Sequence, residues 1–331
     1  MASDKLRWSV WQKISLEHWL SFILTILILF FAGSVDYHYL LPLLGLSEPV
    51  ELQLSPVGEI PIAKQSLANG SFVAVEPTAS ISAQAVYAYE VESGTELYAK
   101  NADELFHPAS VTKLMTALVV KEQLPLESEI EIIKADILQS NKIELVVGER
   151  LTVADLIKAM LISSSNEAAE ALARNYPGGY YALVSAMNQK AQALHLEKTT
   201  FTNVVGYDHT QHLSTAREIN ILAREAMKDE FLRSVVKEPQ LVIQDVAGQY
   251  RHFLENTNQL LMEDSRVKGI KTGTTEAAGE VLVAEYQTAG HTIIIAVLGS
   301  QDRFNDMTQL FNWLLGEYSW YQADFLLLNL E

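Results

Sequence analysis

The chain has 331 residues, 49% of them apolar and 20% charged, so it is long enough to bury a core and is not a disordered chain. Its 41 acidic and 24 basic residues give a formal net charge of -17, which argues against nucleic acid or an anionic surface as the main partner. The absence of cysteine excludes disulfides, thiolate metal sites and cysteine nucleophiles.

The N-terminal region predicts a membrane anchor. Residues 1–18 form a leader that contains three basic side chains, and residues 19–35 (WLSFILTILILFFAGSV) carry no charge. This span can cross a thin bilayer, and the basic leader favours a cytoplasmic N-terminus with the remainder on the extracytoplasmic side of the cell membrane. A signal peptide cut after Ser34 is the alternative, but the long leader and weak cleavage site favour a retained single-pass helix.

Residues 36–80 predict an extended linker. Between Ser47 and Ser80 the chain holds four prolines, scattered Ser and Gly, and no sustained period. We expect a folded domain over 81–320 and a short tail over 321–331.

The folded domain begins with a predicted hairpin. Residues 83–101 (AQAVYAYEVESGTELYAKN) contain two alternating runs around Glu92, Ser93 and Gly94. A helix is predicted from Pro108, because proline suits a first helical turn. A second begins after Thr152, which with Asp155 resembles a capping box before VADLIKAMLI.

The second half of the domain predicts helices and then strands. The helical pattern breaks at SSSN and resumes in EAAEALARN, and further helices are predicted over 180–196 and 215–229. Strands follow over 266–273, 280–287 and 291–300, before an amphipathic helix over 304–318. Strands at both ends with helices between predict an α+β fold, in which one antiparallel sheet is flanked by helices and interrupted by a helical insertion.

Three short motifs carry chemistry when they occur together. They are Ser110-x-x-Lys113 at a predicted helix start, Ser164-Ser-Asn166 at a helix break, and Lys271-Thr272-Gly273 on a predicted strand. A lone Ser-x-x-Lys arises by chance about once in a chain of this length, and Ser234 with Lys237 forms a second one. The Lys-Thr-Gly triplet is expected in only about one such chain in ten, so the set is far more specific than any member.

The spacing of the first motif suits nucleophilic catalysis. Residues three apart share a helix face, so the Lys113 amine can reach the Ser110 hydroxyl. A serine hydroxyl needs a base beside it, and lysine serves only when neutral, a state that burial and the nearby Lys271 would favour. Taken alone, Ser110 would be a helix-start serine, Asn166 a helix cap and Lys271 an exposed strand lysine.

Longer stretches extend the pattern. HPASVTKLMTAL, MLISSSNEAAEALA, FTNVVGYD, NTNQLL and GIKTGTTEAAGEVLVAE resemble the serine D-alanyl-D-alanine carboxypeptidases, which are low-molecular-mass penicillin-binding proteins related to the serine β-lactamases. The resemblance covers roughly residues 81–320 and implies a β-lactamase/DD-peptidase-like fold. Ser234 and Lys237 match nothing in the family pattern.

The resemblance also implies roles for the motif residues. Ser110 would be acylated with Lys113 as its base, and the backbone N–H groups of Ser110 and Thr274 would form an oxyanion hole. Ser164 would relay a proton to the leaving amine, and Asn166 would hold the substrate amide.

The third motif would bind the substrate. By resemblance, Lys271 and Thr272 would receive the C-terminal carboxylate, a local cation within an acidic protein. Gly273 would let the substrate backbone lie against the strand edge as an added strand.

The implied reaction removes the terminal D-Ala from peptidoglycan stem pentapeptides without a cofactor, and β-lactams would inhibit it. A D,D-endopeptidase that cuts cross-links uses the same catalytic residues and is an open alternative. A β-lactamase would need a deacylating glutamate, which Glu197 does not reproduce, and a non-catalytic sensing domain would not need three intact motifs. We expect no second β-rich domain, and the N-terminal segment would take over anchoring.

Two other patterns in the sequence have weaker support. Asp208, His209 and His212 in DHTQH could hold zinc, but no further ligand cluster accompanies them and the equivalent family loop binds no metal, so no metal is expected. His107 is interpreted as a packing residue, and Asn69 in NGS as a chance glycosylation sequence.

Overall fold

The computed structural model describes residues 54–63, 81–137 and 145–326. The chain divides into two compact units, one of residues 57–323 and one of residues 1–56 and 324–331. The predicted anchor at 19–35 and Asn69 lie outside the described residues. Among the helices described, none is both long and apolar enough to cross a membrane.

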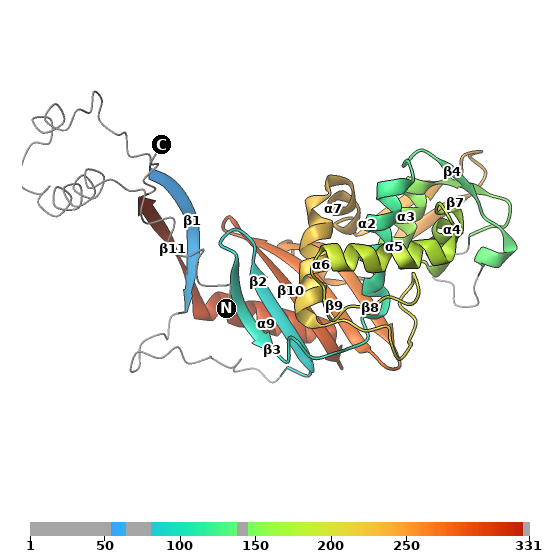
Figure 1. The fold of residues 1–331 in the computed structure, drawn as a ribbon. Helices are drawn as coiled ribbons and strands as arrows, with labels where there is room; N and C mark the ends of the chain where they lie inside the picture. The colour runs from blue at the N-terminus through green and yellow to red at the C-terminus, as the bar shows by residue number, and fades with distance from the viewer. Residues whose placement is uncertain (1–53, 64–80, 138–144, 327–331) are drawn as a thin grey trace, which may run out of the picture. The chain divides into compact units, whose positions relative to one another are not determined.

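An antiparallel five-stranded sheet forms the centre of the larger unit (Figure 1). Its strand order is β3-β2-β10-β9-β8, so β2 and β10, the first and last strands of this sheet along the chain, pair directly. Ala296 of β10 lies between Tyr87 of β2 and Val283 of β9. The prediction of one sheet assembled from distant parts of the chain is therefore confirmed. The strands are β2 (Ala85–Glu90), β3 (Thr95–Lys100), β8 (Val267–Thr275), β9 (Gly279–Thr288) and β10 (His291–Ser300).

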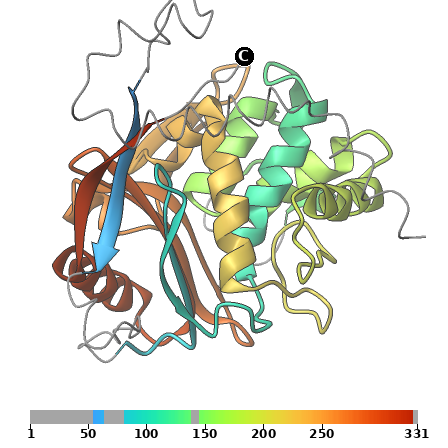
Figure 2. The same ribbon diagram turned by 60° about the vertical axis from the view of Figure 1, so that its left-hand side comes forward.

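Helices cover both faces of this sheet (Figure 2). On one face, α9 (Arg303–Glu317) packs against Ile293 and Ile295 of β10, while α2 (Thr112–Gln123) and α6 (Ala216–Lys228) share a buried cluster with Ile294 and Ala296 on the other. Successive side chains of a strand point to opposite faces, so a strand buried on both sides reads as a continuous apolar run. This explains the sequence HTIIIAVLGS of β10.

The insertion between β3 and β8 is mainly helical. Thr152 begins α3 as predicted, because its hydroxyl accepts a hydrogen bond from the Asp155 N–H at 3.0 Å and donates to the Asp155 carboxylate at 2.8 Å. The helix predicted from Pro108 instead starts as a 3-10 turn, Ala109–Val111, before α2. The other helices are α3 (Val153–Ile162), α4 (Asn166–Asn175), α5 (Tyr180–Ala193), α7 (Glu230–Val236) and α8 (Leu260–Glu263).

Several short elements carry no clear pattern in the sequence. The strands β4 (Glu129–Glu131) and β5 (Arg150–Thr152) form one pair, and β6 (Gln240–Gln244) with β7 (Arg251–Glu255) forms a hairpin. A further strand, β1 (Leu54–Ala63), falls within the predicted linker and pairs with β11 (Tyr318–Leu326). Ser234 of the unmatched pair lies on α7, where its hydroxyl donates to the Phe231 carbonyl.

A buried carboxylate fixes the start of α9. Asp306 is 2% exposed and accepts hydrogen bonds from the Ser82 N–H at 2.9 Å, the Ser82 hydroxyl at 2.7 Å and the Ser300 hydroxyl at 2.6 Å. One side chain thus joins the first turn of α9 to the end of β10 and to the first residues of the folded domain.

Candidate active site

A cleft of about 1140 Å³ opens between the sheet and the helical insertion. It brings together most of the residues that the three motifs predict, because Ser110, Ser164, Asn166 and the Thr272–Thr274 segment all line it. Lys113 and Lys271 are buried, at 0% and 1% exposure, and are not among the lining residues. The remaining lining residues are Ser163, Phe253, Glu255, Asn256, Thr257, Gln259, Arg303 and Phe304.

Lys113 lies directly against Ser110. Its Nζ donates to Ser110 Oγ at 2.9 Å and to the Val205 carbonyl at 2.8 Å. Ser110 belongs to the 3-10 turn and Lys113 to the first turn of α2, which gives the predicted three-residue spacing on one helix face. The contact of hydroxyl and amine expected from the sequence is confirmed.

Two glycines allow other segments to reach the backbone of this turn. A Cβ on Gly206 would lie 1.8 Å from the Ala109 carbonyl oxygen, and a Cβ on Gly273 would lie 2.8 Å from the Ser110 nitrogen. Ala109 itself has φ 47°, a conformation that costs a non-glycine residue energy and is common at functional sites. Gly273 therefore has a second role besides the predicted contact with the substrate backbone. It lets β8 pack against the turn that carries Ser110, called the nucleophile turn below.

The segment from Asn203 to Tyr207 packs against the turn that carries Ser110, although none of its residues lines the cleft. Asn203 Oδ1 accepts hydrogen bonds from the N–H groups of Val205, Gly206 and Tyr207 at 3.2, 2.7 and 3.0 Å. Tyr207 is 45% exposed, and its hydroxyl accepts a hydrogen bond from Asn166 Nδ2 at 3.2 Å. Tyr207 was not predicted as a site residue, although it belongs to the FTNVVGYD stretch.

The serine loop, residues 163–166, lines part of the cleft. Ser164 has φ 60°, which reverses the chain between α3 and α4, and Ser165 caps α4 by accepting from the Ala168 N–H at 3.1 Å. The Ser163 hydroxyl accepts from the Glu255 N–H at 3.1 Å and donates to the Glu255 carbonyl at 3.2 Å. The loop is thereby attached to β7, which the sequence analysis did not identify.

Arg303 supplies a cation that was not predicted. Its Nη1 donates to the Gly273 carbonyl and to the Thr274 hydroxyl, both at 2.6 Å. Burial lowers the pKa of Arg303 and Glu280 opposes the shift, but a guanidinium remains charged in proteins. The residue follows β10 at the first position of α9, and nothing in QDRFND marks it as a site residue.

The lysine of the third motif is buried. Lys271 Nζ donates to the Thr272 carbonyl at 3.1 Å, and the Thr272 hydroxyl donates to the Thr257 hydroxyl at 2.6 Å. Thr272 and Arg303 present polar groups to the cleft, and Lys271 adds positive charge from within the protein.

The zinc candidates have separate hydrogen-bond partners. His212 is 1% exposed, and its Nδ1 accepts from the Thr202 N–H at 3.0 Å, so its Nε2 donates to the Thr112 hydroxyl at 2.8 Å. The Asp208 carboxylate accepts hydrogen bonds from the Thr275 hydroxyl at the end of β8 and from the Ala277 N–H. His209 Nδ1 accepts one from the Gln211 N–H. Within the described part of the chain, their ligand atoms do not converge as a metal group.

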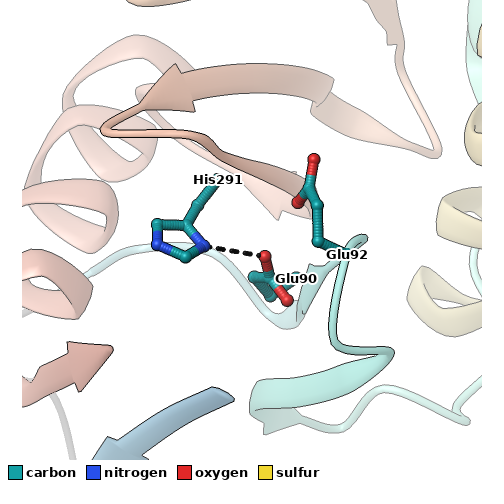
Figure 3. Close-up of side chains that lie close together, drawn as sticks. All are labelled: Glu90, Glu92 and His291. Atoms are coloured by element: carbon teal, nitrogen blue, oxygen red, sulfur yellow. Dashed lines mark hydrogen bonds and ion pairs between the residues drawn. The ribbon is translucent and has the colours of Figure 1, made fainter. Parts of the chain in front are cut away.

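A different group of titratable side chains lies at the far end of the sheet (Figure 3). His291 Nδ1 is 3.2 Å from Glu90 Oε1, Glu90 also accepts from the N–H and hydroxyl of Ser93, and Glu92 accepts from the Thr292 N–H at 2.7 Å. These bonds attach the β2–β3 turn to the start of β10. His291 and Ser300 lie at opposite ends of the ten-residue strand β10, about 30 Å apart, so the group takes no part in the cleft.

The chain matches one protein family. The model of the D-alanyl-D-alanine carboxypeptidase family covers residues 71–302. A D-alanyl-D-alanine carboxypeptidase of Streptomyces strain K15 is 35% identical over 271 residues, which is 75% of this chain and 93% of the relative. A D-alanyl-D-alanine endopeptidase of Pseudomonas aeruginosa is 30% identical over 278 residues, 82% of this chain and 84% of the relative.

Other relatives are longer, and solved structures share the fold. The chain is 32% identical to the D-alanyl-D-alanine carboxypeptidase DacC of Escherichia coli over 251 residues, which is 61% of that protein. The crystal structure of the Streptomyces K15 DD-transpeptidase superposes with a TM-score of 0.69 at 33% identity, over 72% of this chain and 98% of that one. The predicted α+β DD-peptidase-like fold of the folded domain is confirmed.

The packing of Gly206 against Ala109 predicts a loss of reactivity at Ser110. In Gly206→Ala the new methyl group must push the nucleophile turn away, and a displacement of about 1 Å costs roughly a hundredfold in rate. We expect that fall in the rate at which Ser110 reacts with a fluorescent penicillin. Gly290→Ala is the control, because Gly290 has a similar φ of 88° but no atom within 4 Å of its Cβ position. Equal rates for the two variants would contradict the steric argument.

The burial of His212 predicts a loss of stability in acid. Desolvation, together with His107 and His209, lowers the pKa of His212 from 6.5 to about 4. The unfolded state binds more protons between these values, so the free energy of unfolding decreases as the pH falls from about 6.5 to 4. We expect the free energy of unfolding, measured by urea titration, to fall over this interval by about 3 kcal/mol more in the wild type than in His212→Gln. Parallel pH profiles for the two proteins would exclude this contribution.

Proposed function

This chain belongs to the D-alanyl-D-alanine carboxypeptidase family, and from that membership and the geometry of the cleft we propose that it releases the C-terminal D-alanine of peptidoglycan stem peptides through an acyl-enzyme on Ser110. The observation that carries the proposal is the 2.9 Å contact between Lys113 Nζ and Ser110 Oγ beside a cleft that Ser164 and Asn166 line. A nucleophile and its base within hydrogen-bond distance are the expected arrangement for covalent catalysis.

In the acylation step, Ser110 Oγ attacks the carbonyl carbon of the penultimate D-Ala. The neutral amine of Lys113 takes the hydroxyl proton across their existing contact. The amide C–N bond then breaks, Ser164 passes a proton to the leaving amine, and D-alanine departs. Water afterwards attacks the ester carbonyl, releases the shortened peptide as an acid and restores the Ser110 hydroxyl.

The oxyanion of each tetrahedral intermediate would lie against backbone donors. The N–H groups of Ser110 and Thr274 are assigned this role by family resemblance, and each such donor stabilises the transition state by about 3 kcal/mol. The close packing of Gly273 against the Ser110 nitrogen supports the assignment, because it brings the β8 backbone to the nucleophile turn.

The C-terminal carboxylate of the substrate is assigned to the cationic end of the cleft. Arg303, Thr272 and Thr274 offer charged and hydroxyl donors there, with Lys271 buried behind them. Asn166 would bind the amide of the residue that forms the ester. In this arrangement a peptide lies along the exposed edge of β8, a recurrent mode of peptide recognition.

We also propose that residues 19–35 hold the enzyme in the cell membrane, with the catalytic domain on the extracytoplasmic side. The support is the uncharged segment after a basic leader, and the stem peptides of the wall lie on that side. β-Lactams would acylate Ser110 as substrate analogues.

Removal of the nucleophile tests the proposed reaction. Purified full-length protein should release free D-Ala from a stem pentapeptide, and Ser110→Ala should lower the rate by at least about four orders of magnitude. The measurement is enzymatic detection of D-Ala, with Ser234→Ala as the control from the unmatched Ser-x-x-Lys pair. D-Ala release by Ser110→Ala at the wild-type rate would exclude the acyl-enzyme.

Removal of the unpredicted cation tests the binding of the carboxylate. A charge-assisted hydrogen bond is worth about 1.5–3 kcal/mol, so Arg303→Gln should lower kcat/KM for the free acid by about 10- to 100-fold. The same peptide with a C-terminal amide should be a poor substrate for both proteins and should show little difference between them. Arg150→Gln, an exposed arginine paired with Glu129 outside the cleft, should behave as wild type. An equal loss on acid and amide would remove Arg303 from this role.

A further inference from the structure

Residues 205–208 form a loop that connects the regions of all three motifs. The carbonyl of its first residue accepts a hydrogen bond from Lys113 Nζ at 2.8 Å. Its third residue, Tyr207, accepts through its hydroxyl from Asn166 Nδ2 at 3.2 Å. The carboxylate of its last residue accepts from the hydroxyl of Thr275, two residues after the third motif. The position of this loop is therefore tied to the base of the reaction, to the serine loop and to the end of β8.

The backbone of Tyr207 is held on both sides by one side chain. Asn203 Oδ1 accepts from the Tyr207 N–H, and Asn203 Nδ2 donates to the Tyr207 carbonyl, both at 3.0 Å. Gly206, the residue before, has φ 93° and leaves no space for a Cβ beside the Ala109 carbonyl. The tyrosine therefore reaches Asn166 from a backbone with little freedom to shift.

The side-chain amide of Asn166 depends on Tyr207 for its orientation. Among the described residues, the contact with the Tyr207 hydroxyl is the only hydrogen bond that this amide makes. The last torsion of an asparagine side chain has broad preferences, so a partner must set it. Ser165 caps α4 and fixes only the backbone at Asn166. Removal of the tyrosine hydroxyl would leave the amide free to rotate.

Binding of a substrate amide requires an oriented amide on the protein. A side-chain amide carries two N–H donors and one acceptor oxygen. Since one N–H of Asn166 donates to Tyr207, the other N–H and Oδ1 are left for the cleft that Asn166 lines. A peptide amide offers the complementary carbonyl and N–H. Tyr207 does not line the cleft, so its effect on a substrate passes through Asn166.

We propose that Tyr207 is a positioning residue that orients the amide of Asn166 toward the substrate amide on the acyl side of the scissile bond. The inference rests on the proposed function and deepens it, because it names the residue that prepares Asn166 for that contact. Tyr207 thereby makes the acylation of Ser110 selective for acyl groups that carry an amide at this place. The bond that breaks and the path of the proton stay as in D-alanine release.

The test compares two substrates of equal length with the same scissile bond and the same terminal D-Ala. In one, an amide precedes the penultimate residue; in the other, –CH2–CH2– replaces that –CO–NH–. For full-length wild type we expect the amide substrate to have the higher kcat/KM for D-Ala release. Tyr207→Phe removes only the hydroxyl, so it should lower kcat/KM for the amide substrate by about fivefold, in the range of one hydrogen bond, and leave the other substrate unchanged.

A double-mutant cycle gives a second readout. Asn166→Ala removes the group through which Tyr207 acts, so Tyr207→Phe should cause no further loss on the amide substrate in that background. Tyr181→Phe is the matched control, because Tyr181 is an 86% exposed tyrosine of α5 whose hydroxyl makes no hydrogen bond among the described residues. This control should retain the wild-type rate on both substrates.

Three results would overturn the inference while D-Ala release continued. An equal loss on both substrates in Tyr207→Phe would indicate a general structural role. Additive losses in the double variant would show that Tyr207 does not act through Asn166. Equal kcat/KM of the wild type for the two substrates would show that Asn166 binds no amide at this place.

Failure of the wild type to release D-Ala from either substrate would instead overturn the proposed function. The rate at which β-lactams acylate Ser110, followed by mass spectrometry, then decides the inference. Tyr207→Phe should slow acylation by benzylpenicillin, which carries a side-chain amide, by about fivefold and should leave acylation by 6-aminopenicillanic acid, which carries none, unchanged. Equal slowing with both compounds would contradict the positioning role.

Discussion

The absence of side chains at two glycines is the constraint on which the rest of the site depends. Gly206 and Gly273 come from segments 67 residues apart, yet each would collide with Ala109 or Ser110 if it carried a Cβ. Ser110 can therefore be reached by β8 on one side and by the loop before Asp208 on the other. The contact of Lys113 with both Ser110 and the Val205 carbonyl follows from the same close approach, because Val205 precedes Gly206.

The sequence was sufficient to predict those parts of the site that depend on short-range spacing. Ser110 and Lys113 share a helix face, and Thr152 caps its helix through Asp155, because both relations are set within one turn. Arg303 and Tyr207 could not be found in this way, since tertiary packing alone brings Arg303 of α9 into the cleft and the Tyr207 hydroxyl against Asn166. A single arginine at a helix start and a single tyrosine in a loop have no periodic signal.

The β6–β7 hairpin was missed for a different reason. Phe253, an apolar residue of β7, is 57% exposed, whereas His252 and Leu254 on the other face of the strand are buried. The expected alternation of buried apolar and exposed polar residues is therefore inverted at Phe253 and His252. The turn DVAGQ, with Gly248 at φ 73°, was the remaining signal.

The hydrogen bonds of Asp306 connect the first residues of the folded domain to the first turn of α9. Arg303 lies one helical turn before Asp306, and Asp306 is fixed by the backbone and hydroxyl of Ser82. Any shortened form of the protein that begins after Ser82 would leave a 2% exposed carboxylate with two fewer donors, at a cost of about 1–3 kcal/mol for each unsatisfied group. The first turn of α9 would loosen and Arg303 would lose its fixed position. The point at which the chain enters the domain therefore contributes to the position of Arg303 in the cleft, although it lies in a different segment from every motif.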